Sequence, residues 1–247
     1  MSGTEARTEC VFGSVGVFGG TFDPVHLGHL RAAEEVRAAL RLERVVFVPS
    51  ANPPHKERSV GPTVAAAEDR LRWLRLAVSE HPAFEVDPIE IERGGTSFAV
   101  DTLRSLRSRS DGRPPTFLIG RDAFVLIATW REPEALFELA NFAVMTRPPD
   151  SDQTLRDWIP GAFRKTFDLS ADGQSARHRN ANTSIKRVDI PALEISSSAI
   201  REGIAKGRSV RYLMPDPVYC AVCKSGHYEL PSREKPDHEG TQRSEHA

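Results

Sequence analysis

The sequence predicts an α/β protein in which a parallel sheet carries helices on both faces. Short apolar runs, several of them rich in β-branched residues, alternate with stretches whose apolar residues recur at helical spacing. Such alternation indicates parallel strands joined by helical crossovers. The 247 residues are also enough for one good core with a small appendage.

The expected elements follow one another in a regular order. Each strand is predicted from a short apolar run, and each helix from apolar residues three or four positions apart. Strands are expected at 15–18, 45–49, within 84–91, and at 116–120, 141–147 and 185–191. The helical stripes comprise Leu30, Ala33, Val36 or Arg37, and Leu40; Ala67, Leu71, Leu74, and Ala77 or Val78; and Ala99, Thr102, Leu103 and Leu106.

Other segments fall outside this pattern. The stretch from about 170 to 184 is polar and aperiodic, so we expect a mobile surface loop there. We expect a flexible tail at 1–12 and a single domain over 13–229. Residues 230–247 lack apolar content and are expected to form a disordered tail.

The C-terminal part of the domain is expected to be helical. The segment "PDPVYCAVCKSG" (215–226) has Pro near its start and Gly226 at its end, as many helices do. Cys220 and Cys223 form a C-x-x-C within it, but the chain has only three cysteines and no second such pair. We therefore interpret both as ordinary helix residues rather than as a redox or zinc site.

The composition argues against several classes of partner. A net charge of −1 gives no electrostatic argument for binding nucleic acid or a membrane surface. No apolar run is long enough to span a bilayer, and the first ten residues contain no apolar signal region. We therefore expect a cytoplasmic protein that binds neither nucleic acid nor membranes, and its oligomeric state stays open.

A segment rich in glycine and histidine, "GGTFDPVHLGHL" (19–30), joins the first strand to the first helix. Gly19 and Gly20 allow the backbone to approach a ligand closely, and Asp23-Pro24 makes a turn into the helix. His26 and His29, three positions apart, can face the same side of the helix start. Free N–H groups and the helix dipole favour a phosphate there, and two imidazoles can bind its oxygens. The sequence therefore predicts a phosphate-binding loop.

Two common phosphate-binding loops do not fit this segment. The glycine spacing differs from G-x-G-x-x-G, and no Lys stands where G-x-x-x-x-G-K-[ST] requires one. The segment therefore argues against a dehydrogenase and against a P-loop NTPase. A single histidine in such a loop is more often structural, but the complete pattern after the first strand is hard to explain by packing alone.

With its paired H-x-G-H histidines, the segment resembles the first signature of the nucleotidylyltransferase superfamily. A second signature of that superfamily, Ser-x-Thr-x-x-Arg at the start of a late helix, is similar to "ISSSAIREGI" (195–204). Ser196, Ser198 and Arg201 have this spacing, with Ser198 in place of Thr. Ser196 or Ser197 is also a good N-cap, and hydroxyl, helix N-terminus and guanidinium would converge on phosphate oxygens.

Further segments narrow the resemblance. In order and position, "PSANPPHK" (49–56), "TSFAVDTL" (96–103), "FLIGRDAFVLIATW" (117–130) and "MTRPP" (145–149) resemble the bacterial nicotinate-nucleotide adenylyltransferases. The likeness extends from about residue 15 to residue 228. It implies a Rossmann-like, doubly wound parallel sheet of the nucleotidylyltransferase type with a small C-terminal helical part, and a site at the carboxyl ends of the strands.

The resemblance implies roles for particular residues. Catalysis would depend on His26, His29 and Arg201. ATP and its phosphates would be bound by Gly19, Gly20, Thr21, Phe22, Ser196 and Ser198, and the mononucleotide by Lys56, Phe98, Ala99, Gly120, Asp122 and Trp130. Plainer interpretations stay open for three of these: Lys56 as a solvated residue, Asp122 as a helix N-cap and Trp130 as a core residue. Trp73 and Trp158 match no functional position and are interpreted as packing residues.

The implied reaction is adenylyl transfer from ATP to nicotinate mononucleotide, which gives deamido-NAD and pyrophosphate. The mononucleotide phosphate would attack ATP directly, without a protein nucleophile, and Mg²⁺ would be bound mainly through ATP phosphates, so no protein ligand to a metal is expected. Relatives commonly have Ser-Tyr-Thr where this chain has Ser97-Phe98-Ala99, which leaves the preference for acid over amide open. Transfer to nicotinamide mononucleotide or to both mononucleotides, and a non-catalytic nucleotide-binding module, remain alternatives.

Overall fold

The computed structural model describes residues 14–52, 64–110, 112–146, 153–191 and 193–229. Its centre is an eight-stranded sheet with the order β3-β2-β1-β4-β5-β8-β7-β6. The pairs from β3 to β8 are parallel, whereas β7 and β6 continue the sheet as antiparallel strands. The strands are β1 Val15–Gly20, β2 Arg44–Pro49, β3 Phe84–Val86, β4 Thr116–Gly120, β5 Asn141–Thr146, β6 Phe167–Leu169, β7 Ser175–His178 and β8 Ser184–Asp189. The α/β prediction with a largely parallel sheet is confirmed.

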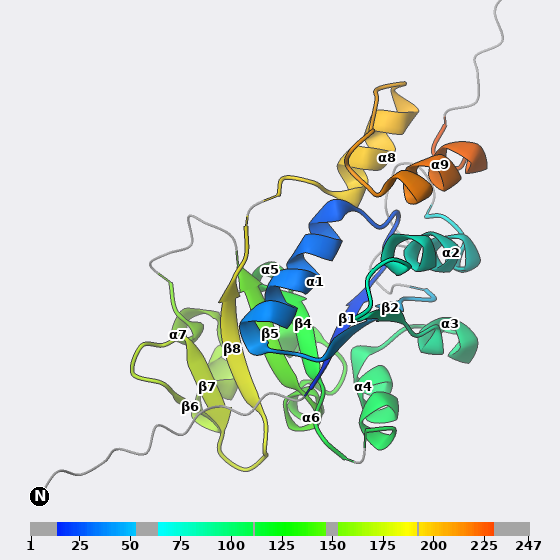
Figure 1. The fold of residues 1–247 in the computed structure, drawn as a ribbon. Coiled ribbons are helices and arrows are strands. Elements are labelled where there is room, and N and C mark those ends of the chain that lie inside the picture. Colours follow the sequence, from blue (N-terminus) through cyan, green and yellow to red (C-terminus); the bar gives the residue numbers. More distant parts are fainter. Residues whose placement is uncertain (1–13, 53–63, 111, 147–152, 192, 230–247) are drawn as a thin grey trace, which may run out of the picture.

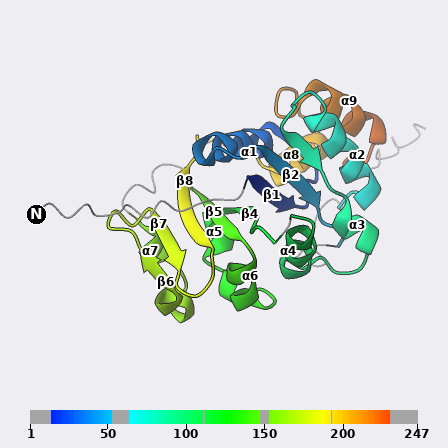
Figure 2. The same cartoon turned by 60° about the horizontal axis from the view of Figure 1, so that its bottom comes forward.

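Helices cover both faces of this sheet (Figures 1 and 2). The helices are α1 Leu27–Leu40, α2 Ala67–Val78, α3 Ile89–Arg93, α4 Ala99–Ser108, α5 Arg121–Phe124, α6 Pro133–Leu139, α7 Leu155–Trp158, α8 Ser197–Ala205 and α9 Asp216–Ser225, with the 3₁₀ turns η1 Ile127–Thr129 and η3 Gly161–Thr166. In Figure 2, α1, α2 and α9 lie over one face, and α4 and α6 over the other. The predicted C-terminal helical part is thus present as α8 and α9.

The sheet separates two apolar cores. Phe18 and Phe47 point to the face covered by α1 and α2. Their chain neighbours Val17 and Val46 point to the face covered by α4 and α6. This alternation follows from the two-residue period of a strand, and it explains why the strands of the parallel part are continuous apolar runs.

The strand order reverses between β1 and β4. From β1 the chain proceeds outward through β2 and β3 on one side, and through β4, β5 and β8 on the other. At such a switch point the connections leave the sheet in opposite directions and open a crevice at the carboxyl ends of the strands. The segment that follows β1 lies at this point, so the fold places the predicted phosphate loop at the crevice.

The prediction of a loop over 170–184 is wrong in its centre, because β7 lies there and pairs with β6 and β8. Ala176 and His178 are buried while Arg177 is exposed, so the strand has the expected alternation. It covers only four residues, which is too short to be recognised among polar neighbours. The preceding turn is held by Asp172, whose carboxylate accepts bonds from the Ser170 hydroxyl at 2.6 Å and the Gln174 N–H at 3.0 Å.

The buried face of α2 comprises Arg70, Trp73, Leu74 and Val78. Leu74 and Val78 belong to the predicted stripe, whereas Ala67 and Leu71 of that stripe are only partly buried. Trp73 and Trp158 are 0 % and 2 % exposed, so their interpretation as packing residues is confirmed. The expected tails at 1–12 and 230–247 lie outside the described residues.

Candidate active site

The site is built around the loop that leaves the carboxyl end of β1. Gly20 ends this strand, and a Cβ added there would come within 3.0 Å of the Phe22 ring. Phe22 has a positive φ of 50° and is buried in the core. Gly20 is therefore explained by the packing of Phe22, and a bound nucleotide could meet Phe22 only through its backbone.

The two histidines of the motif lie side by side at the start of α1. Their ring centroids are 3.7 Å apart and the ring planes differ by 24°, so the rings are stacked. The backbone N–H of His26, which is the N-cap, donates to Nδ1 of His29 at 3.3 Å. A Cβ on Gly28 would crowd Nδ1 of His26 at 3.0 Å. Both rings are thus held together at the positive end of the helix, as their spacing predicts.

The second signature lies against the first. Ser196 caps α8, and its Oγ accepts a backbone N–H of the first turn at 3.1 Å. Ser197 donates its hydroxyl to the Pro24 carbonyl at 3.0 Å, and Arg201 donates from Nη1 to the Asp23 carbonyl at 2.8 Å. These bonds fix the start of α8 beside the start of α1 (Figure 1). The structure therefore brings together two motifs that are about 170 residues apart, since Ser197 and Pro24 differ by 173 positions.

Arg201 connects the buried loop with the exposed start of α8. Its Nη1 lies 3.3 Å from the Asp23 carboxylate, and its Nη2 donates to the Ser198 hydroxyl at 3.3 Å. The Asp23 side chain is 0 % exposed and that of Arg201 is 13 % exposed, whereas Ser198 is exposed. Arg201 is therefore the counter-charge of a buried carboxylate, a role that the motif alone does not reveal.

A second buried guanidinium, that of Arg70, holds the backbone of the loop. Its Nη1 donates to the Thr21 carbonyl at 2.7 Å, its Nη2 to the Ala51 carbonyl at 3.0 Å and its Nε to the Ala65 carbonyl at 3.0 Å. Burial lowers the pKa of Arg70, and the negative charge of Asp23 opposes this shift. Sequence reasoning missed Arg70, because a charged residue on a helix is normally interpreted as exposed.

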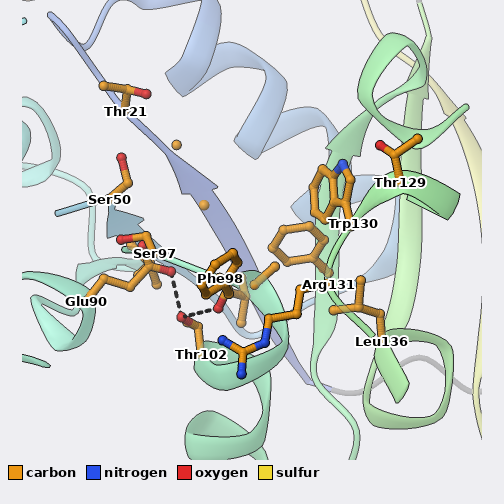
Figure 3. A pocket seen from close by; sticks show the side chains of 16 residues that line it. Thr21, Ser50, Glu90, Ser97, Phe98, Thr102, Thr129, Trp130, Arg131 and Leu136 are labelled. Carbon is orange, nitrogen blue, oxygen red and sulfur yellow. Dashed lines mark hydrogen bonds between the residues drawn. The ribbon is translucent and has the colours of Figure 1, made fainter. Parts of the chain in front are cut away.

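A cavity of about 290 Å³ lies beside α4, against β1, the end of β2 and the first part of β4 (Figure 3). Its walls are mainly apolar and carry a few polar groups, which is typical of a small-molecule site. Six residues predicted to bind nucleotides line it: Gly19, Gly20, Thr21, Phe98, Ala99 and Trp130. The histidine pair and α8 are not among its lining residues, so the site has two parts that share the segment 19–21.

Trp130 and Arg131 close one side of this cavity. Trp130 is only partly buried and contacts the edge of Phe117, with ring centroids 6.3 Å apart. The Arg131 guanidinium carbon lies 4.7 Å from the centroid of the Phe98 ring. Arg131 also forms a long ion pair with Asp101 at 3.8 Å. The sequence analysis did not identify Arg131, although it directly follows Trp130, a residue predicted to bind the mononucleotide.

Two further polar residues line the cavity opposite Trp130 and Arg131 (Figure 3). Ser50 is 9 % exposed, and within the described part of the chain its buried Oγ has no hydrogen-bond partner. Glu90 is buried as well, and one of its carboxylate oxygens accepts the Thr102 hydroxyl at 2.6 Å. A buried hydroxyl without a partner is costly, so Ser50 is a candidate contact for a ligand.

The start of α4 forms part of the cavity wall. Its N-cap is Phe98, and no side-chain hydrogen bond caps it. The Ser97 hydroxyl instead accepts the Ala51 N–H at 3.0 Å. The first N–H groups of a helix have no acceptor within the helix, and here they lie at the cavity wall formed by Phe98 and Ala99.

Three predicted residues are not placed in either part. Lys56 lies outside the described residues. Gly120 is the N-cap of α5, so the interpretation of Asp122 as an N-cap is wrong. The Asp122 side chain is 94 % exposed and pairs with Arg121 at 3.2 Å, and neither Gly120 nor Asp122 lines the cavity.

The described part of the chain contains neither a cluster of metal-binding side chains nor a membrane-spanning helix. There, no group of three or more His, Cys, Asp or Glu side chains could hold a metal ion. No helix among the same residues is long and apolar enough to cross a membrane.

The fold and the paired motifs define a nucleotidyltransferase with a Rossmann-like α/β domain. The sequence model of the family described as Cytidylyltransferase-like matches residues 17–203. More particularly, the chain belongs to the nicotinate-nucleotide adenylyltransferase family.

Individual relatives support this membership. A protein of Citrifermentans bemidjiense named "Probable nicotinate-nucleotide adenylyltransferase" is 43 % identical over 204 residues, which cover 83 % of this chain and 93 % of that protein. A protein of the same name from Trichlorobacter lovleyi is 38 % identical and covers 87 % of this chain and 99 % of its own length. The fold is similar to that of the nicotinic acid mononucleotide adenylyltransferase of Plasmodium falciparum, solved in complex with NaAD, with a TM-score of 0.63 at 15 % identity over 87 % of this chain and 96 % of that one.

Proposed function

We propose that this chain transfers the adenylyl group of ATP to nicotinate mononucleotide, giving deamido-NAD and pyrophosphate. The observation that carries the proposal is the two-part site. The stacked histidines and the start of α8 form a cationic, hydrogen-bonding side. The cavity with Trp130 and Phe98 forms an aromatic side, and the segment 19–21 lies between them. This arrangement suits a triphosphate on one side and a pyridine mononucleotide on the other.

The reaction needs no protein nucleophile. A phosphate oxygen of the mononucleotide attacks the α-phosphorus of ATP, the new P–O bond forms, and the bond to the β-phosphate oxygen breaks, releasing pyrophosphate. His26 and His29 donate hydrogen bonds to phosphoryl oxygens at the helix N-terminus, where negative charge builds up. Arg201, with Ser196 and Ser198, meets the phosphates at the start of α8. Positioning and charge neutralisation therefore account for catalysis.

A magnesium ion would be held mainly by the phosphates of ATP. The loop carboxylate, Asp23, already accepts two hydrogen bonds and pairs with Arg201, so it has little capacity left for a metal. Mg²⁺ keeps several water ligands and often binds through substrate phosphates. When bound, the ion would neutralise phosphate charge during the transfer.

The mononucleotide would bind in the cavity. Its pyridine ring would stack on Trp130, and its carboxylate would accept N–H groups from the first turn of α4, at Phe98 and Ala99. Arg131 adds a positive charge to the same region. Lys56 is proposed to meet the phosphate, and Asp122, at the carboxyl end of β4 with Gly120, to accept ribose hydroxyls after its exposed side chain turns inward.

The function is tested by pyrophosphate release with ATP and a panel of mononucleotides. We expect nicotinate mononucleotide to be the best acceptor. Preferred use of nicotinamide mononucleotide would make the chain a sister enzyme, and ATP binding without any release would make it a nucleotide-binding module. We further propose that the protein acts in the cytoplasm on small molecules and binds no nucleic acid.

A further inference from the structure

Just after α9, the chain passes beside the loop that follows β1. The Tyr228 hydroxyl donates to Oδ1 of Asp23 at 2.7 Å, although the two residues are 205 positions apart. The Tyr228 ring is buried beside Trp73, with ring centroids 6.0 Å apart. Packing explains the ring but not the hydroxyl, because burying a hydroxyl is costly without a hydrogen bond.

Asp23 has divided its two oxygens between different partners. Oδ1 accepts the Tyr228 hydroxyl and the Ala65 N–H, the latter at 3.0 Å. Oδ2 lies 3.3 Å from Nη1 of Arg201. The Asp23 side chain that makes these contacts is 0 % exposed. In such a buried place electrostatic interactions are strong, and water does not replace a missing partner.

The Arg201 guanidinium lies on the other side of this carboxylate. While Oδ1 has two donors, Nη1 of Arg201 lies 3.3 Å from Oδ2 without a hydrogen bond to it and donates to the Asp23 carbonyl at 2.8 Å. The other end of the guanidinium then reaches Ser198 at the exposed start of α8. Without the phenol, Oδ1 would be open to the cation, and the guanidinium could turn toward the interior.

We propose that Tyr228 is a positioning residue: acting through Asp23, it holds Arg201 in the orientation that meets the phosphates of ATP. The inference rests on the proposed function, in which Arg201 contacts ATP. It gives the C-terminal end of the domain a part in the reaction, although no atom of Tyr228 touches the substrates.

The first experiment compares Tyr228→Phe with a matched control, Tyr219→Phe. Tyr219 is on α9 and its ring lies 5.3 Å from the Arg211 guanidinium, away from Asp23. We expect Tyr228→Phe to lower kcat/KM for ATP about 10-fold, as loss of a hydrogen bond to a charged group would, and to leave KM for the mononucleotide unchanged. We expect Tyr219→Phe to equal the wild type. Equal losses in both variants, or none in Tyr228→Phe, would overturn the proposal.

A double-mutant cycle separates positioning from stability. The cycle combines Tyr228→Phe with Arg201→Lys, each assayed well below its melting temperature. If Tyr228 acts through Arg201, its removal should cost less than about 3-fold once Arg201 is Lys. If the two losses simply multiply, Tyr228 does not act through Arg201 and the proposal fails.

The affinity for a non-hydrolysable ATP analogue, measured by calorimetry for the same four proteins, keeps this test independent of the acceptor. A wild type that binds the analogue but forms no deamido-NAD would contradict the proposed function. The double-mutant cycle would still decide whether Tyr228 positions Arg201, because it can be calculated from the affinities for the analogue. Coupled losses of affinity would support the proposal, and independent losses would contradict it.

Discussion

The two parts of the site are built in different ways. On the side that we propose binds phosphates (the phosphate side), Asp23, Arg201 and Arg70 are largely or fully buried, and both guanidinium groups donate short hydrogen bonds to carbonyls of the loop. On the side that we propose binds the mononucleotide, Phe98, Ala99 and Trp130 are partly exposed and line an open apolar cavity. Buried charges must be paired, so the phosphate side tolerates few residue types, whereas an apolar wall can be made from many.

The departures from the expected family pattern follow the same division. The phosphate motif departs from the signature that it resembles only at Ser198, whereas the segment at the cavity has Phe98 and Ala99 where the resemblance leads us to expect Tyr and Thr. If the contrast is correct, substitutions on the phosphate side should cost most, and substitutions in the cavity should mainly change which mononucleotide is used.

The largest effect is expected for Asp23→Asn. The substitution leaves Arg201 and Arg70 without their buried counter-charge, and breaking a buried pair typically costs about 3–5 kcal/mol. Urea unfolding of the variant and the wild type measures the difference in the free energy of unfolding. Asp168→Asn is the matched control, since Asp168 pairs with Arg179 at the surface. A loss below about 1 kcal/mol, the range of surface pairs, would show that the cluster is not a rigid unit.

The next effect is expected for His26→Ala and His29→Ala. Each variant should lower kcat by roughly 10²–10³, by analogy with the removal of one donor from an oxyanion hole, with little change in the KM for the mononucleotide. His81→Ala serves as the control, because His81 stacks on Phe84 between α2 and β3. If a variant is folded, as judged by circular dichroism, and retains near-normal turnover, the histidines do not take part in the reaction.

On the cavity side, Arg131→Gln should reduce the preference for the acid. The guanidinium is about half exposed and paired with Asp101, so solvent screening limits the change in the ratio of kcat/KM values to about 3–10-fold. Arg104→Gln is the control, since Arg104 binds Glu132 nearby but does not line the cavity. The same change in both variants would indicate a general effect of charge rather than a contact.

Ser50→Ala should have an effect of similar size, but on the KM for the mononucleotide rather than on the preference for the acid. If the buried Ser50 hydroxyl finds its partner in the bound mononucleotide, the variant should raise the KM for the mononucleotide about 3–10-fold, the cost of one neutral hydrogen bond, and leave kcat nearly unchanged. A lower or unchanged KM would mean that the hydroxyl contacts no substrate. Steady-state kinetics at saturating ATP distinguish these results.

The sequence predicted what is encoded locally. The apolar runs located the strands of the parallel part, and the histidine and serine motifs located two helix starts that the structure brings together. Arg70 and Tyr228 could not be found in this way, because their importance arises from partners far away in the chain. The short strand β7 was not predicted, because four residues give too little alternation. The outward orientation of Asp122 could not be predicted either, because it depends on how α5 begins.

The smallest effect is expected for Ala99→Thr. It introduces the hydroxyl that the family resemblance leads us to expect, but we propose that backbone N–H groups at the start of α4 hold the carboxylate, and those are present whatever the side chain. The ratio of kcat/KM for the two mononucleotides should therefore change by less than about 5-fold, the scale of one weak neutral hydrogen bond. A larger gain in the preference for the acid would assign the selectivity to the missing hydroxyl.

The most direct test of the account is the ratio of kcat/KM for nicotinate and nicotinamide mononucleotide in the wild-type protein. Charged hydrogen bonds contribute roughly 1.5–3 kcal/mol, so we expect a preference for the acid of about 10–100-fold or more. An amide presents an NH₂ group to the same donors and lacks the charge. Equal use of both mononucleotides would contradict a cavity in which backbone donors and Arg131 select the carboxylate.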